Sequence, residues 1–246
     1  MKAKSYAATR YIPFGDSGLL VEFGDSIDLE TNRKVTALAE AITKATMHGV
    51  EELVPTYRSL LIRYDPMETS YETLVFHVRD VERTLRDAGS EAKGRRLVVP
   101  VVYGGEYGPD LSYVARSHKL SDCQVVQMHS ATDYRVYMIG FVAGFPYLGE
   151  VSDKIATPRF ETPRLKVPAG SVGIAEKQTG IYPREAPGGW RIIGRTPLRL
   201  FNPFEQPPTP LKAGDTVKFK PISEKEFRTT TQNEPSMATV EKVRFA

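Results

Sequence analysis

The sequence predicts an α+β fold in which a small N-terminal α+β domain precedes a β-rich C-terminal domain. Over about the first ninety residues, two amphipathic helical stripes alternate with short apolar strands. Beyond a polar stretch, the apolar runs are short and punctuated by glycine and proline, which is typical of a barrel or a sandwich. A chain of 246 residues is long enough for two modest domains. We therefore place the N-terminal domain at residues 1–90 and the C-terminal domain at residues 94–246.

The first expected elements are a strand and a helix. The apolar run Leu19–Phe23 follows the turn-rich segment Tyr11–Gly18, and this pattern indicates a strand. A helix is expected over Leu29–Met47, because its apolar residues recur at i, i+3, i+4 and i+7 and form one stripe. That stripe consists of Val35, Leu38, Ala39 and Ile42. Gly49 stands where a C-cap glycine would end this helix.

Two further strands and a second helix complete the expected N-terminal domain. The strands are Val50–Pro55 and Ser59–Tyr64, and the helix runs over Ser70–Ala88 with Thr69 or Ser70 as its N-cap. The apolar stripe of this helix consists of Leu74, Val75, Val78, Val81 and Leu85. The order strand, helix, strand, strand, helix suits a small sheet covered by two helices on one face.

The composition changes at Gly89–Arg96, which is polar, contains two glycines and lacks apolar periodicity. This change marks the domain boundary. One short helix and six strands are expected beyond it: the helix Ser121–His129 and the strands Leu97–Tyr103, Tyr134–Phe141, Ser171–Ala175, Trp190–Ile193, Leu198–Phe201 and Thr216–Phe219. The tail from Thr229 is polar, with Val240 and Phe245 as apolar residues that would dock it.

The overall composition indicates a soluble globular protein without a nucleic-acid or membrane partner. Hydrophobic residues make up 41% of the chain, and the net charge is only +3. The longest basic cluster, Lys93–Arg96, is too short for the basic face that nucleic-acid binding needs. The N-terminal residues Met1–Phe14 lack an apolar core of signal-peptide length, and no segment reaches the apolar length of a membrane span. The single cysteine, Cys123, excludes an internal disulfide and suits a cytoplasmic location.

Familiar catalytic and metal-binding motifs are absent from the sequence. Cys123 has no base beside it, so we interpret it as a half-buried helix residue rather than a nucleophile. Neither G-x-x-x-x-G-K-[ST] nor G-x-S-x-G occurs, and the four histidines lack metal-ligand spacing. His129, near the end of a predicted helix, is a candidate base, although a structural role is the alternative. Acidic residues such as Asp110 flank glycine-rich turns, but sequence alone does not pair them.

The segment Gly140–Gly149 is unusual, because it holds three glycines and three aromatic residues in ten positions. Glycine weakens a plain strand, so we interpret this run as a shaped loop whose backbone approaches another group closely. The alternative is a tight barrel corner whose aromatic rings fill the core. As a shaped loop, the segment offers Phe141, Phe145 and Tyr147 as candidate substrate-binding residues.

A second dense region follows, from Arg164 to Leu198. Arg164, Gln178, Tyr182 and Trp190 combine a guanidinium, an amide and large aromatic faces. Such a mixture suits a pocket for a small polar acid or amide. The alternative is that each side chain satisfies a loop carbonyl or packs in the core.

Several motifs occur in the order found in a known family. They are Phe14–Phe23, Val54–Ile62, Tyr103–Leu111, Gly140–Leu148 and the region from Arg164 to Leu198. Through these motifs the chain resembles the allophanate hydrolase subunit 1 family, which includes the B-type subunit of bacterial 5-oxoprolinase and the sporulation kinase A inhibitor. The resemblance extends from Tyr11 to about Lys220. Ala143 departs from it, since the family usually has proline there in G-F-x-P-G-F.

The resemblance implies a cyclophilin-like β-barrel as the C-terminal domain and a function within a larger enzyme. The implied partners are an allophanate hydrolase subunit 2-type protein (the C-type subunit of 5-oxoprolinase) and the A-type subunit of 5-oxoprolinase. Together they would open 5-oxo-L-proline to L-glutamate with ATP, whose binding would be shared with the partners. Arg164 and Gln178 would then stabilise charge on the activated lactam. The alternative function is non-catalytic inhibition of a sensor histidine kinase.

Overall fold

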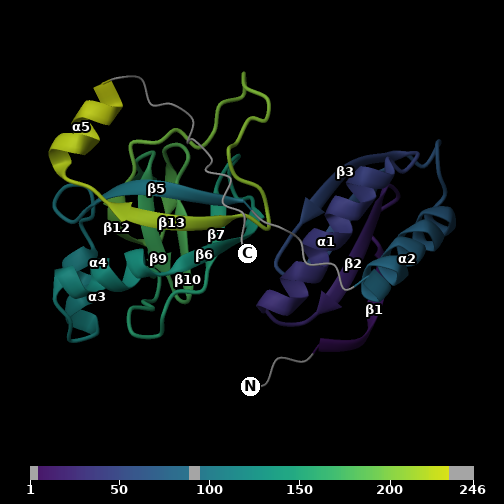
Figure 1. The fold of residues 1–246 in the computed structure, drawn as a ribbon, viewed down its shortest axis with the longest axis horizontal. Coiled ribbons are helices and arrows are strands. Elements are labelled where there is room, and N and C mark those ends of the chain that lie inside the picture. The colour runs from purple at the N-terminus through teal and green to yellow at the C-terminus, as the bar shows by residue number, and fades with distance from the viewer. Residues whose placement is uncertain (1–4, 89–94, 233–246) are drawn as a thin grey trace. The chain divides into compact units, whose positions relative to one another are not determined.

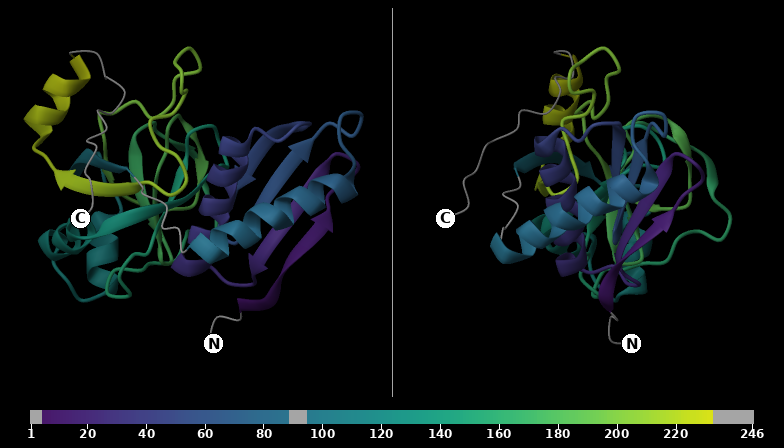
Figure 2. Two further views of the ribbon diagram at one scale, coloured as in Figure 1. Left: turned by 45° about the vertical axis from the view of Figure 1, so that its right-hand side comes forward. Right: turned by 90° about the vertical axis from the view of Figure 1, so that its right-hand side faces the viewer.

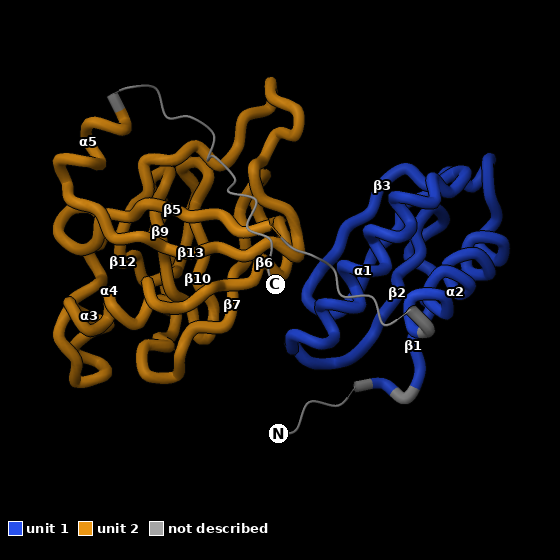
Figure 3. Tube along the Cα trace, viewed as in Figure 1, with its two compact units in different colours: residues 1–93 blue, residues 94–246 orange. Residues whose placement is uncertain are grey.

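The computed structural model describes residues 5–88 and 95–232. The chain divides into two compact units, Met1–Lys93 and Gly94–Ala246 (Figures 1 and 3). Most of the boundary expected at Gly89–Arg96 lies outside the described residues, as do Val240 and Phe245. Among the described helices, none combines the length and apolar character that crossing a bilayer requires.

The N-terminal unit is a four-stranded antiparallel sheet, ordered β1-β2-β4-β3, with two helices. Its elements are β1 (Ser5–Pro13), β2 (Gly18–Gly24), α1 (Leu29–Ala45), β3 (Val50–Pro55), β4 (Ser59–Tyr64) and α2 (Tyr71–Ala88). Strands β3 and β4 have the predicted bounds, and β2, α1 and α2 agree with prediction within two residues at each end. Strand β1 was missed, because the apolar residues of this edge strand do not alternate regularly and the strand gains its stability by pairing with β2.

Both helices cover one face of this sheet, as the element order predicts. Alternate residues of the two central strands, including Leu19, Val21, Leu60 and Ile62, share one buried cluster with the stripes of α1 and α2. The C-cap of α1 is Thr46 in the left-handed region (φ 48°), so the prediction that Gly49 ends the helix is wrong. Gly49 instead forms the turn that leads into β3.

The C-terminal unit is a closed seven-stranded barrel, ordered β10-β7-β6-β13-β5-β12-β9, which confirms the predicted fold class and decides for a barrel over a sandwich. The barrel strands are β5 (Arg96–Tyr103), β6 (Asp133–Ile139), β7 (Pro146–Gly149), β9 (Ser171–Ala175), β10 (Gln178–Ile181), β12 (Arg191–Arg195) and β13 (Thr216–Pro221). Strands β13 and β5 are parallel, and the other pairs are antiparallel. A separate two-stranded sheet joins β8 (Arg164–Val167) to β11 (Ala186–Gly188).

Within residues 95–232, three helices accompany the barrel: α3 (Leu111–Ser117), α4 (Asp122–Ala131) and α5 (Glu224–Gln232). Helices α3 and α4 lie side by side, as Figure 1 and the left-hand view of Figure 2 show. Helix α4 begins after Ser121, which forms a capping box with Gln124. Cys123 is exposed on α4, which corrects the prediction of half-burial, because Val125 and His129 occupy the buried face of this helix.

The predicted strand Leu198–Phe201 does not form, and Leu200 instead packs into the barrel core. Pro197 and Pro203 flank this segment, and proline has no backbone N–H to donate to a strand ladder. The sequence also failed to predict β7, β8, β10 and β11, since strands of three or four residues are too short for a recognisable period.

Candidate functional site

The barrel unit contains a pocket of about 590 Å³. The structure brings together all five aromatic residues that the sequence singles out as substrate-binding candidates: Phe141, Phe145, Tyr147, Tyr182 and Trp190 line this pocket. They come from the loop after β6, from β7, and from the segments that follow β10 and precede β12. The pocket volume is of the size that holds a small ligand.

Phe145 is the centre of this aromatic group. It is 1% exposed, and its ring centroid lies 4.9 Å from that of Tyr147, 5.1 Å from Tyr182 and 5.4 Å from Trp190. The contacts to Tyr182 and Trp190 are edge-to-face, which is a favoured arrangement of aromatic rings. The pocket therefore has a rigid apolar floor.

Two glycines make this close packing possible. A Cβ atom on Gly180 would lie 2.9 Å from ring atoms of both Phe145 and Trp190, and one on Gly188 would lie 2.0 Å from the Tyr182 hydroxyl oxygen. Any larger residue would displace the rings, so glycine here serves the close approach of side chains rather than chain flexibility.

The loop between β6 and β7 combines both of the roles that the sequence left open. Its Phe145 fills the core, whereas Phe141 is 61% exposed and has a positive φ of 65°. The backbone N–H of Gly140 donates to the Phe145 carbonyl at 3.0 Å, and the Phe145 N–H donates to the Val142 carbonyl at 3.0 Å. These bonds close the turn although Ala143 stands where the family usually has proline. A strained, exposed aromatic residue at the edge of a pocket is typical of a functional site.

Polar groups of the pocket come from two tyrosines and two charged residues. The remaining lining residues are Val142, Arg159, Phe160, Glu161, Pro163, Pro187, Gly188 and Gly189. Burial raises the pKa of Tyr182 to about 12, and burial also raises the pKa of Tyr147. Both hydroxyls therefore stay protonated at neutral pH. Sequence reasoning missed Arg159 and Glu161, since isolated charged residues are common on surfaces and carry no signal of their own.

Arg164 lies beside the pocket but is not among its lining residues. Its two terminal nitrogens donate to the Asp110 carboxylate at 2.8 and 2.7 Å, and the same carboxylate accepts the backbone N–H of Ile192 at 2.7 Å. The Arg164 guanidinium also lies over the Phe160 ring, 4.3 Å from its centroid. Arg164 thus connects β8 to the start of α3 and supports one wall of the pocket.

Gln178 opens strand β10, where it pairs with Gly149 of β7 and Ala175 of β9. It is partly buried and is not among the lining residues of the pocket. The structure therefore does not bring Gln178 to the aromatic group directly. Its predicted role as a donor to the substrate stays a prediction.

His129 is completely buried in the barrel core and is not one of the residues that line the pocket. The Thr179 hydroxyl donates to the Gly173 carbonyl at 2.9 Å, so it accepts from His129 Nε2–H, also at 2.9 Å. The other ring nitrogen, Nδ1, then accepts from the Tyr103 hydroxyl at 2.8 Å. These contacts describe a neutral, fully hydrogen-bonded core histidine, which favours the structural alternative over a catalytic base.

The burial of His129 leads to a prediction for stability against pH. Burial lowers its pKa to about 3, below the ordinary value of about 6.5. As pH falls below about 6.5, the unfolded chain gains a proton that the folded chain does not bind, so the free energy of unfolding falls by about 1.4 kcal/mol per pH unit. Urea denaturation between pH 7.5 and 5 should show this loss, about 2 kcal/mol at pH 5.

His129→Gln removes the titrating group, so the variant should lose less stability than the wild type over the same pH range. The exposed His77 on α2 provides the matched control, and His77→Gln should follow the wild type. Equal pH dependence in wild type and His129→Gln would contradict the prediction.

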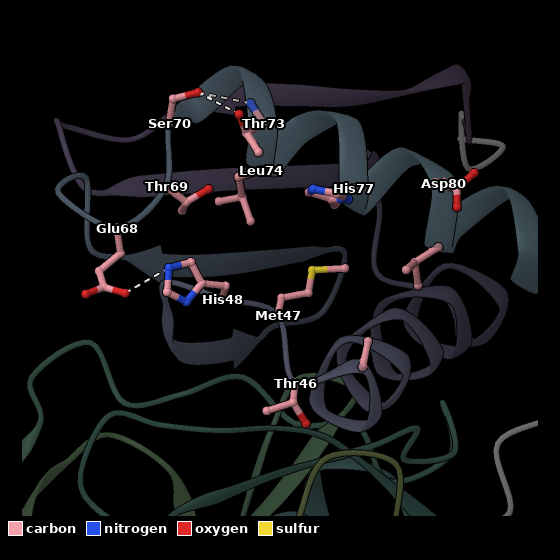
Figure 4. Close-up of a pocket in the computed structure, with 12 residues that line it drawn as sticks. Thr46, Met47, His48, Glu68, Thr69, Ser70, Thr73, Leu74, His77 and Asp80 are labelled. Carbon is pink, nitrogen blue, oxygen red and sulfur yellow. Dashed lines mark hydrogen bonds and ion pairs between the residues drawn. The ribbon is translucent and has the colours of Figure 1, made fainter.

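A second pocket, of about 580 Å³, lies in the N-terminal unit between the end of α1 and the start of α2 (Figure 4). Its polar side chains include His48, Glu68, His77 and Asp80, and His48 Nε2 lies 3.0 Å from a Glu68 carboxylate oxygen. Within residues 5–88 and 95–232, no three His, Cys, Asp or Glu side chains are grouped to hold a metal ion.

Comparison with known proteins places the chain in a family. The model of the carboxyltransferase domain, subdomain C and D, matches residues 9–211. The B-type subunit of 5-oxoprolinase from Bacillus subtilis is 46% identical over 87% of this chain and 92% of its own length. The corresponding subunit from Haemophilus influenzae is 41% identical over 85% of this chain and 95% of its own length.

A solved structure agrees with this placement. The structure of TTHA0988 superimposes with a TM-score of 0.75 at 36% identity and covers 84% of this chain, which spans 40% of that longer protein. The chain therefore belongs to the family defined by the carboxyltransferase domain, subdomain C and D, and this confirms its resemblance to the allophanate hydrolase subunit 1 group.

Proposed function

We propose that the chain is the B-type subunit of an ATP-dependent 5-oxoprolinase, which opens 5-oxo-L-proline to L-glutamate together with partner subunits. The observation that carries this proposal is the 46% identity to the B-type subunit from Bacillus subtilis over 92% of that relative. The named relatives favour an enzyme subunit over the alternative of a non-catalytic inhibitor of a sensor histidine kinase.

The contribution of this chain is to bind and orient the lactam in the aromatic pocket. The apolar ring would lie against Phe145 and Trp190, and the side chains of Tyr147 and Tyr182 line the same space. In the reaction water adds to the lactam carbonyl carbon, the C–N bond breaks, and the nitrogen takes up a proton. Transfer of the ATP terminal phosphoryl group to the carbonyl oxygen would activate that carbon and release inorganic phosphate afterwards.

The three residues predicted as catalytic receive different roles in this proposal. Arg164 acts mainly as a positioning residue, because its guanidinium is bonded to Asp110 and supports Phe160. Gln178 remains a candidate donor for charge on the activated lactam. His129 holds the barrel core through Tyr103 and Thr179 and takes no part in the chemistry.

The partners in this proposal are an allophanate hydrolase subunit 2-type protein, equivalent to the C-type subunit of 5-oxoprolinase, and the A-type subunit of the same enzyme. The absence of a P-loop motif from the sequence supports ATP binding that is shared with these partners. The longer chain of TTHA0988, of which this protein spans 40%, supports a larger assembly. We place the complex in the cytoplasm. We treat residues 1–90 and 94–246 as separate domains, because each contains its own buried hydrophobic cluster.

Reconstitution tests the function directly. The three proteins should be co-expressed, and ATP-dependent formation of glutamate from 5-oxo-L-proline measured. Turnover is expected when all three proteins and ATP are present and should disappear when this chain is omitted. A complete, purified complex without turnover would contradict the proposal. Arg164→Ala and Gln178→Ala in an active complex test the assigned roles, and unchanged rates in both would exclude these residues from the site.

A further inference from the structure

The lining of the aromatic pocket includes one arginine, Arg159, whose guanidinium takes no part in holding the described structure together. Arg159 lines the pocket and is exposed, and it has no hydrogen-bond or ion-pair partner among the described residues. The neighbouring arginines, Arg164 and Arg191, form hydrogen bonds within the barrel unit. Arg164 pairs with Asp110, and Arg191 donates to the Pro158 carbonyl at 3.1 Å. Arg159 is therefore the arginine of this group that remains available to a ligand.

The backbone on both sides of Arg159 is held in place. The Pro158 carbonyl before it accepts from Arg191, and the Phe160 N–H after it donates to the Gly189 carbonyl at 2.7 Å. The Phe160 ring contacts two guanidinium groups, with centroid distances of 3.6 Å to Arg191 and 4.3 Å to Arg164. This support fixes the backbone from which the Arg159 side chain extends, so ligand binding has to order only that side chain.

The charge of Arg159 acts on the polar groups of the same pocket. It lowers the pKa values of Tyr147 and Tyr182, against the larger rise that burial causes. The guanidinium therefore shares a common space with both hydroxyls. The other charged residue of the lining, Glu161, is also exposed and lies two positions further along the chain.

We propose that Arg159 selects substrates that carry a carboxylate next to a small apolar ring. This inference rests on the proposed function and deepens it, because 5-oxoproline differs from the plain lactam 2-pyrrolidinone by one carboxylate. A guanidinium binds a carboxylate through two parallel N–H···O bonds, while Phe145 and Trp190 contact the ring. Arg159 acts as a specificity-determining residue, and bond cleavage does not require it.

The single tryptophan of the chain provides a direct readout. Trp190 is 7% exposed and lines the pocket, so its fluorescence in the isolated full chain reports binding there. Titration with 5-oxo-L-proline and with 2-pyrrolidinone should give at least ten-fold tighter binding of the carboxylate, as expected for one charge-assisted pair. Arg159→Gln should remove this preference, and Arg159→Lys should keep part of it.

Glu161→Gln is the matched control, since it changes an exposed charge of the opposite sign in the same segment. It should bind 5-oxo-L-proline as tightly as the wild type or more tightly, because a like charge is removed. In the active complex, Arg159→Gln should raise the KM for 5-oxo-L-proline at least ten-fold and leave kcat within about three-fold.

The outcomes separate this inference from the proposed function. A wild-type complex that forms no glutamate contradicts the function, and the fluorescence titration still tests Arg159. No fluorescence response to 5-oxo-L-proline, equal affinity for the two lactams, or an unchanged preference in Arg159→Gln overturns the assignment of Arg159.

Discussion

Asp110→Ala is expected to lower the free energy of unfolding of the barrel unit by about 3 kcal/mol, the lower end of the range for breaking a buried ion pair. The Asp110 side chain is 8% exposed and accepts hydrogen bonds from Arg164 and from the backbone N–H of Ile192. Its removal leaves a guanidinium and a buried N–H without their acceptor. We choose the lower end because the Arg164 side chain is 33% exposed and water solvates it in part.

Urea denaturation followed by Trp190 fluorescence measures this effect, because Trp190 reports on the barrel unit alone. The Arg164 guanidinium also contacts the Trp190 carbonyl at 3.5 Å, so the ion pair lies next to the fluorescent residue in the chain. Arg164→Ala should also lower the free energy of unfolding. The loss in the double variant should be smaller than the sum of the two single losses, by about 1 kcal/mol or more. Additive losses would show that the two residues stabilise the barrel independently, and a loss below about 1 kcal/mol for Asp110→Ala would show that the ion pair contributes little.

Phe145→Ala is expected to cost about 3–5 kcal/mol, because it removes a buried ring and leaves a cavity. The ring contacts Tyr147, Tyr182 and Trp190, so three walls of the pocket lose their common support. We also expect a loss of kcat/KM in the assembled enzyme, since a poorly positioned lactam is a poor substrate. Urea denaturation and the glutamate assay measure the two effects.

Phe141→Ala is the matched control within the same loop. Phe141 is 61% exposed, so its truncation should change the free energy of unfolding by no more than about 0.5 kcal/mol. Its effect should appear instead in the KM for 5-oxo-L-proline, because the ring lies at the edge of the pocket. Similar destabilisation by both variants would mean that the loop contributes to the fold as a whole rather than through the Phe145 ring.

Local patterns in the sequence predicted much of the N-terminal unit. The stripe containing Val35, Leu38 and Ile42 requires one helix face to be buried, and the structure buries all three. In the C-terminal unit, Ser121 starts α4 as predicted, and it forms a capping box with Gln124. Such signals depend on residues a few positions apart, and the same interactions operate in the folded chain. Predictions were poorer in the barrel, where strands of three or four residues have no measurable period.

The sequence by itself determined the fold class, the helices of the N-terminal unit and the aromatic residues that line the pocket, because composition, periodicity and glycine content are local properties. Only the tertiary structure decided what distant residues do. Arg164 meets Asp110 across 54 positions, His129 meets Thr179 across 50, and Arg159 lies beside rings from β7 and from the segment before β12. These contacts arise from the closure and register of the barrel, in which each strand is positioned by partners far away in the chain.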